Sequence, residues 1–209
     1  DDGVLVLQFP TYAATLRNRE WNALRHGHFA YHSVPAARRL LADVGLGVVA
    51  ARSYALYGGS VLLLASRSGA GPADEQAAVD ALERDEIDAG VLDPALMAPL
   101  AQAPAHDVAW LRDWVARQPD GAWLYGAGSR AVAVLAAAGL PDGAVTAIVD
   151  GAPAKQGRRM PGTTIPIVAP DVLLAADPQE ILLMLPDLLG ELREAWPGLS
   201  GRWVVYGAR

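Results

Sequence analysis

The sequence WLYGAGSR, residues Trp123–Arg130, predicts a short strand, a tight glycine turn and the first turn of a helix. The helix continues to Ala138, and the apolar run Val145–Val149 predicts a second strand. Because the first amides of a helix have no partner within the helix, they carry a partial positive charge toward the turn. We therefore expect the turn to bind a phosphate or another anion.

A long loop follows the second strand, from Asp150 to Thr163. It carries three cations among turn-forming glycines and prolines: Lys155, Arg158 and Arg159. Prolines stiffen a loop and lower the entropy that it loses when it closes on a ligand. The pattern predicts a loop that folds over the anion at the glycine turn and binds a pyrophosphate through Lys155 and Arg158.

Composition narrows the possible classes of protein. The 209 residues have a formal net charge of −6 and a pI of about 5.1, so a nucleic-acid surface is not expected. The chain has no cysteine, and its four histidines are scattered, so no metal site is predicted. It also shows neither a membrane span nor a signal peptide, which predicts a cytoplasmic protein. The oligomeric state stays open, and a monomer is only slightly favoured.

The chain begins Asp-Asp-Gly without an initiator methionine, so we expect a fragment whose beginning is missing. The apolar run Val4–Phe9 predicts a central strand buried on both faces. Ser33 is predicted to cap a helix that starts at Val34 and buries a stripe of Leu40, Leu41 and Val44. Strands are predicted at Val48–Ala55 and Ser60–Ala65.

Three segments follow from these patterns. Residues 1–68 form the first domain, 69–106 a linker with a connecting helix, and 107–209 a second domain. The connecting helix, Asp74–Ala89, ends in the acids Glu83, Asp85, Glu86 and Asp88, which are expected to form a solvated face. Asp107 is predicted to cap the helix that leads to the strand at Trp123. Strands alternating with helices predict an α/β fold with parallel pairing.

Three motifs in the second domain resemble a known family. They are Tyr-Gly-Ala at 125–127, Asp-x-x-Pro-x-Lys-x-Gly at 150–157 and Pro-Gly-Thr-x-Ile-Pro-Ile at 161–167. This order resembles the C-terminal domain of S-adenosylmethionine-dependent C-methyltransferases that act on nucleotide-linked deoxysugars. The resemblance implies the end of a class I methyltransferase Rossmann-like sheet followed by a second Rossmann-like α/β domain. It also places most of the S-adenosylmethionine site in the missing N-terminal half.

The resemblance assigns the glycine turn and its surroundings to a nucleotide-diphosphate sugar. The substrate-binding residues that it implies are Ser60, Tyr125, Gly126, Ala127, Arg130, Asp150, Lys155, Arg158 and Thr163. Arg130 stands where the family usually has a lysine, which keeps the positive charge.

The sequence RHGHFAYHS, residues 25–33, stands where the family has a Tyr-His-Glu-His motif. Methylation of a sugar carbon requires a base that removes a proton beside a keto group, and a neutral histidine with a pKa near ~6.5 can do so. The resemblance gives this role to His28. His26 and Arg25 complete the predicted catalytic set, and Arg25 is a candidate for stabilising the enolate oxygen.

Two alternatives remain open at the level of sequence. Arg25 and Gly27 replace the family's tyrosine and glutamate, and Leu62 replaces an arginine after Gly-Gly-Ser. These departures favour a catalytically silent module that binds nucleotide sugars. The pattern G-x-G-x-x-A at 126–131, with Asp150 at the end of the next strand, also fits an NAD-dependent oxidoreductase.

Overall fold

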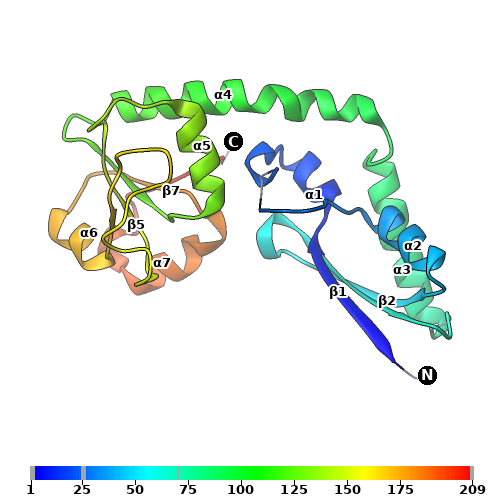
Figure 1. Ribbon diagram of the computed structural model, residues 1–209. Coiled ribbons are helices and arrows are strands. Elements are labelled where there is room, and N and C mark those ends of the chain that lie inside the picture. Colours follow the sequence, from blue (N-terminus) through cyan, green and yellow to red (C-terminus); the bar gives the residue numbers. More distant parts are fainter. Residues whose placement is uncertain (1–2, 25–26, 70, 208–209) are drawn as a thin grey trace. The chain divides into compact units, whose positions relative to one another are not determined.

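The computed structural model describes residues 3–24, 27–69 and 71–207, and the chain divides into two compact units. The first unit is Asp1–Gln102 and the second is Ala103–Arg209. Each unit has its own β-sheet, three-stranded and antiparallel in the first and five-stranded and parallel in the second (Figure 1). The predicted α/β fold is confirmed.

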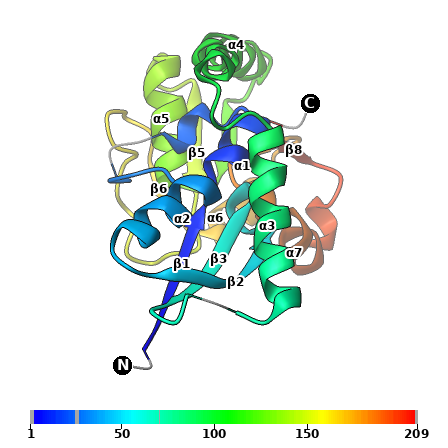
Figure 2. The same ribbon diagram turned by 90° about the vertical axis from the view of Figure 1, so that its right-hand side faces the viewer.

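The sheet of the first unit has the order β1-β3-β2, and α2 and α3 lie on one of its faces (Figure 2). The elements of this unit are β1 (Val4–Pro10), α1 (Tyr12–Arg17), η1 (Trp21–Ala23), α2 (Val34–Asp43), β2 (Gly47–Tyr54), η2 (Leu56–Gly58), β3 (Ser60–Ser66), α3 (Ala73–Asp88) and η3 (Pro94–Leu96). The predicted connecting helix is α3, which packs against β2 and α2 inside this unit.

Strand β1 differs from its prediction as a central, fully buried strand. Within the described residues it pairs only with β3, so it lies at an edge of the sheet. Val4 and Val6 are 55% and 57% exposed. An apolar strand with one unpaired edge is a surface on which another strand can pair. Its apolar composition therefore reflects a face that no described residue covers.

Helix α2 begins as predicted, with the Ser33 hydroxyl oxygen accepting the amide hydrogen of Ala36 at 3.3 Å. The helix buries Val34, Ala37 and Leu41. Two members of the predicted stripe, Leu40 and Val44, are instead exposed. The buried stripe is thus shifted toward the beginning of the helix, where α2 packs on α3 and β2.

The second unit is a parallel sheet between two layers of helices, with α4 and α5 on one face and α6 and α7 on the other (Figure 1). Its elements are α4 (Met97–Ala116, which begins in the first unit), β4 (Ala122–Tyr125), α5 (Ser129–Ala138), β5 (Val145–Val149), β6 (Ile167–Val168), α6 (Pro170–Ala176), β7 (Ile181–Leu183), η4 (Pro186–Leu188), α7 (Leu189–Ala195), η5 (Pro197–Leu199) and β8 (Trp203–Val205).

The strand order β6-β5-β4-β7-β8 decides where a ligand can bind in this unit. From β4 the chain first moves outward through β5 and β6, then returns to the other side of β4 as β7 and β8. All five strands stay parallel, but the side of β4 on which new strands are added changes between β6 and β7. In open parallel sheets, ligands bind at the carboxyl ends of the strands beside such a reversal. The glycine turn Gly126–Gly128 lies at this point.

Helix α4 starts ten residues before its predicted cap at Asp107 and continues through Pro104. Proline lacks an amide hydrogen and usually interrupts a helix. Here Leu100 and Ala103 are buried, and their packing favours the longer helix. The Asp107 carboxylate has another role, since it accepts a hydrogen bond from the Tyr206 hydroxyl at 3.1 Å.

Candidate functional site

The glycine turn joins β4 to α5 by a sharp change of direction. Gly126 has a φ of 101°, and a Cβ atom on it would lie 2.8 Å from the side chain of Leu185. The positive φ and this close approach both require glycine. Gly128 precedes α5 and provides no side chain that caps the helix. The turn thus presents main-chain amides, as predicted, although Leu185 covers one of its sides.

The amide of Ala127 and the Lys155 side chain converge on the carboxylate of Asp150. Oδ2 accepts the Ala127 amide hydrogen at 3.0 Å and lies 2.8 Å from Lys155 Nζ. Oδ1 accepts the amide hydrogen of Ala152 at 2.9 Å. The Asp150 side chain is 11% exposed and that of Lys155 is 43% exposed. The Ala127 amide and Lys155, both predicted to bind the anion of a ligand, therefore meet at a carboxylate of the same chain.

The loop after Asp150 is folded back against β6. Gln156 Nε2 donates to the main-chain oxygen of Asp150 at 3.0 Å. Farther along, the amide of Gly157 donates to Ile167, and the amide of Ile167 donates to Arg158, at 3.0 and 2.8 Å. These bonds fix the position of Lys155 relative to the end of β5. The position of the loop is therefore set by hydrogen bonds within the protein.

The remaining predicted cations, Arg158, Arg159 and Arg130, provide none of the three hydrogen bonds above to the Asp150 carboxylate. Arg158 and Arg159 are exposed, and neither makes an ion pair with any residue that the structure describes. Arg130 is half-buried in the first turn of α5. Arg158 lies within a few residues of Lys155, whose carbonyl accepts the Arg158 amide hydrogen at 3.2 Å. Its guanidinium is available to an anion near this loop.

Thr163 is not brought together with Asp150. Its hydroxyl donates to the carbonyl of Met160 at 3.0 Å and accepts the amide hydrogen of Ile165 at 3.2 Å. Thr163 also contacts a cavity of about 360 Å³ beside Asp142. These residues precede β5 and β6, so Thr163 lies at the amino edge of the sheet, opposite the glycine turn. It shapes the loop rather than the anion site.

Tyr125 ends β4 in an aromatic cluster that the sequence analysis did not identify. Its ring lies 5.7 Å from those of Trp196 and Trp203, in edge-to-face contacts. Burial, followed by the nearby charge of Asp150, raises the pKa of the Tyr125 hydroxyl. The tyrosine is therefore protonated at neutral pH and can donate a hydrogen bond. The two tryptophans are far apart in sequence from Tyr125, and no local motif links them.

The predicted base lies in the first unit. The His28 ring is 5.4 Å from the ring of Tyr31, whose hydroxyl donates to the carbonyl of Ala23 at 3.0 Å. The predicted residues Arg25 and His26 lie outside the described part of the chain. Tyr31 thus supports His28 and joins the loop to the segment before it.

Ser60 begins β3 and is 1% exposed. Its hydroxyl donates to the carbonyl of Leu56 at 2.8 Å, so its hydrogen is used within the protein. Ser60 also contacts a cavity of about 410 Å³ that includes Arg17, Tyr54 and Glu86, all in the first unit. Its predicted role is therefore restricted to accepting a hydrogen bond.

Glu86 was predicted to lie on a solvated face, but it is 3% exposed. Its Oε2 accepts the amide hydrogen of Val34 at 2.5 Å, and the Thr11 side chain lies close enough to lower the pKa of the carboxyl. Burial raises the pKa of the carboxyl, against the opposing effects of Val34, Thr11 and Arg17. The acidic row gave no signal that distinguishes this glutamate from its neighbours.

Among residues 3–24, 27–69 and 71–207, no three histidine or acidic side chains are grouped as metal ligands. No helix in this part of the chain has the length and apolar character to cross a membrane.

The second unit is an α/β domain with a five-stranded parallel sheet and a glycine turn at the strand reversal, the place where open α/β sheets bind ligands. The chain belongs to the C-methyltransferase C-terminal domain family, whose model matches residues 55–206. This finding confirms the predicted resemblance to the C-terminal portion of C-methyltransferases.

A similar protein is the C-methyltransferase NovU of Streptomyces niveus, which is 27% identical over 211 residues. The match covers 98% of this chain and 50% of NovU. The chain therefore spans about half the length of this curated relative.

The Asp150–Lys155 pair predicts a stability effect. Lys155→Ala leaves a largely buried carboxylate without its cation, so we expect the free energy of unfolding of the second unit to fall by about 1–3 kcal/mol. Urea denaturation followed by tryptophan fluorescence measures this change, because every tryptophan except Trp21 lies in that unit. The control Arg159→Ala is expected to stay within about 0.5 kcal/mol of the wild type. Equal losses in both variants would contradict the importance of the pair.

Glu86 predicts a pH dependence. Folding raises the pKa of the Glu86 carboxyl above its ordinary value. The stability that protonated Glu86 contributes is therefore fully present below the ordinary pKa, and it is lost as the pH rises through the pKa of the folded chain. Gln carries no such charge. We therefore expect the melting temperature of Glu86→Gln to rise relative to the wild type between about pH 4 and about pH 7, as measured by calorimetry. A difference that is constant or falls over this range would argue against a destabilising buried charge.

Proposed function

We propose that this chain is the C-terminal half of an S-adenosylmethionine-dependent C-methyltransferase that acts on a nucleotide-linked keto-deoxysugar. The observation that carries the proposal is the convergence of the Ala127 amide and Lys155 on one anionic group at the strand reversal. Family membership supports methyl transfer to carbon as the reaction.

The diphosphate of the substrate binds, in this proposal, where the Asp150 carboxylate now holds Lys155. Lys155 is partly exposed, and Arg158 is exposed and unpaired among the described residues, so both can turn to a ligand. A diphosphate carries more negative charge than one carboxylate and can contact both cations and the amide of Ala127 in the turn before α5. Gly126, Arg130 and Tyr125 form the surroundings of this site, with the Tyr125 hydroxyl as a donor.

The methyl donor is placed elsewhere. Leu185 covers Gly126, and the Asp150 carboxylate accepts the amide hydrogen of Ala127. The glycine turn therefore has no room for an adenosyl group in addition to the diphosphate. We assign the S-adenosylmethionine site to a segment upstream of this chain. When bound there, the cofactor supplies an electrophilic methyl group.

His28 is the proposed base of the reaction. Its imidazole accepts the proton from the sugar carbon beside the keto group, and the electrons of that C–H bond form an enolate. The enolate carbon then forms a bond to the methyl group, whose bond to the sulfonium sulfur breaks with its electron pair staying on sulfur, so that S-adenosylhomocysteine leaves. Arg25 and His26 are proposed to stabilise the enolate oxygen, and Tyr31 holds the His28 ring in place. Ser60 is proposed to accept a hydrogen bond from the sugar.

Strand β1 supports the proposal that the chain is part of a longer protein. Its outer edge pairs with no described strand, and Val4, Leu5 and Val6 are exposed. A strand from an upstream domain would satisfy the free backbone groups and cover these side chains. The length of NovU, twice the matched region, is consistent with such a domain.

A second candidate function is a catalytically silent module that binds nucleotide sugars. Gly27 is exposed and provides no carboxylate beside His28, and Leu62 occupies the position of the family's arginine. In this alternative the site in the second unit is unchanged and methyl transfer is absent. Activity measurements separate it from the first proposal, whereas ligand binding does not.

Binding is tested by isothermal titration of the 209-residue chain with dTDP. We expect Lys155→Ala to weaken binding by about tenfold to a hundredfold, because a charge-assisted contact is lost. Arg159→Ala is the control cation, and its affinity is expected to stay near that of the wild type. Titration with NAD, which the oxidoreductase alternative requires, is expected to give no heat of binding. Unchanged dTDP affinity in Lys155→Ala would remove this residue from the site.

Catalysis is tested in the chain joined to its upstream half, with a dTDP-linked keto-deoxysugar and S-adenosylmethionine. We expect His28→Asn to lower kcat by at least about 100-fold, since a general base is lost. Methyl transfer is measured by mass spectrometry of the sugar product. Retention of full activity in this variant would overturn the assignment of the base, and a wild type without activity would favour the silent module.

A further inference from the structure

Glu86 is buried in a row of acids that are otherwise in contact with water. Its neighbours Asp85 and Asp88 on α3 are exposed, whereas Glu86 is 3% exposed. A carboxylate removed from water is strongly disfavoured unless hydrogen bonds satisfy it. The groups that provide these bonds therefore indicate what the side chain does.

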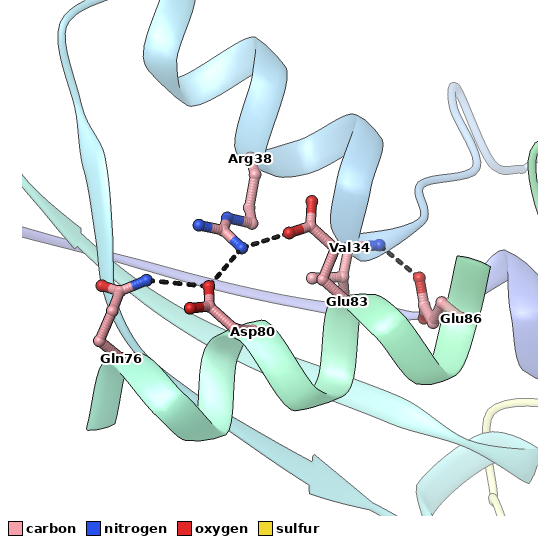
Figure 3. Close-up of polar contacts among 6 residues, drawn as sticks. All are labelled: Val34, Arg38, Gln76, Asp80, Glu83 and Glu86. Atoms are coloured by element: carbon pink, nitrogen blue, oxygen red, sulfur yellow. Dashed lines mark hydrogen bonds and ion pairs between the residues drawn. The ribbon is translucent and has the colours of Figure 1, made fainter. Parts of the chain in front are cut away.

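The Glu86 carboxylate lies at the beginnings of two helices. Oε2 accepts the amide hydrogen of Val34, the first residue of α2 (Figure 3). The side chain of Thr11, the N-cap of α1, is close enough to lower the pKa of the carboxyl. Helix beginnings carry a partial positive charge, which favours a carboxylate at both places. Through the bond to Val34, Glu86 joins α3 to the beginning of α2, beside the beginning of α1.

Thr11 and Val34 both lie beside the end of the loop 27–33, which carries His28. The amide of Tyr12, the first residue of α1, donates to the carbonyl of His32 at 2.8 Å. Val34 follows His32 by two residues and donates to Glu86. The end of the loop is therefore fixed to the beginning of α1 on one side and to α3 on the other.

The contacts continue from this fixed end to His28. Tyr31 immediately precedes His32 and places its ring 5.4 Å from the ring of His28. The Tyr31 hydroxyl also donates to the carbonyl of Ala23, at the other side of the loop. A shift of the loop end would move Tyr31, and with it the support of the His28 ring.

We propose that Glu86 is a positioning residue for His28. Its carboxylate holds the end of the loop 27–33 against α3, beside the bond of His32 to the beginning of α1, and this fixes the place and orientation of the imidazole. The inference rests on the proposed function only where it gives His28 the role of base. The positioning itself concerns the first unit and can be measured without a substrate.

Glu83 provides a matched control. It lies about one turn before Glu86 on α3, and it pairs with Arg38 of α2, beside a second pair between Arg38 and Asp80 (Figure 3). Its side chain is 26% exposed. Glu83→Gln therefore removes the same charge from the same pair of helices without changing a group that contacts the loop.

The first experiment uses nuclear magnetic resonance on the 209-residue chain. We expect Glu86→Gln to increase hydrogen exchange of the Val34 amide by about tenfold or more, because a hydrogen bond to a charged acceptor is weakened. The ring resonances of His28 shift in the same variant. Glu83→Gln is expected to change neither. Glu86→Asp, which keeps the charge but shortens the side chain, is expected to shift His28 as well.

Two outcomes of this experiment would overturn the proposal. In one, Val34 and His28 behave as in the wild type in both Glu86 variants. In the other, Glu83→Gln produces the same changes. Melting temperatures are recorded for every variant, so that a loosened loop is separated from general unfolding.

The second experiment measures methyl transfer in the chain joined to its upstream half. We expect Glu86→Gln to lower kcat by about tenfold to a hundredfold through misplacement of the base, with KM within about twofold of the wild type. Glu83→Gln is expected to retain both constants. A displaced His28 with unchanged kcat would overturn the catalytic consequence. Absence of activity in the wild type would overturn the proposed function, and the loop measurements would still decide the positioning.

Discussion

The carboxylate of Asp150 is the group on which the arrangement of the second unit depends. Three donors meet it, from the turn after β4, from the residues after β5 and from the side chain of Lys155. Without them the largely buried charge would be strongly unfavourable, and without the carboxylate the donors would be unpaired. The glycine turn and the cationic loop are therefore fixed relative to one another by a single acid, and the proposed diphosphate site takes its geometry from that acid.

The first unit also holds a buried carboxylate at a helix beginning, but the cost of desolvation is larger there than the stabilisation by its neighbours. This carboxylate belongs to Glu86, its bonded donor is the Val34 amide, and Thr11 and Arg17 lower its pKa without an ion pair. Desolvation consequently dominates, and the pKa of Glu86 is raised. Asp150 has a cation at 2.8 Å. Lys155 can exchange Asp150 for the anion of a ligand with little loss of solvation. Glu86 has no such cation to exchange, and it is better suited to hold a loop in place.

The local parts of this structure were readable from sequence. Val145–Val149 is a strand with the predicted bounds, and the glycine turn and the Ser33 cap follow from short patterns whose physics is local. Features that depend on distant packing were not readable. The exposure of β1 depends on which strands pair with it, and the continuation of α4 through Pro104 depends on buried neighbours. Likewise, nothing in the acidic row marks Glu86, because its burial results from contacts more than fifty residues away.

The pairing of Lys155 with Asp150 lowers the affinity that a ligand can gain from Lys155. A ligand that replaces Asp150 at Lys155 gains only the difference between two charge-assisted contacts, and it must also leave the displaced carboxylate with other partners. A monoanion of similar size would gain little from this exchange. In the proposed binding mode, a diphosphate takes Lys155 from Asp150 and adds a contact to Arg158, so that its second charge provides the net gain. Exchange against an internal carboxylate would in this way favour ligands with two linked anionic groups, such as the proposed nucleotide-linked sugar.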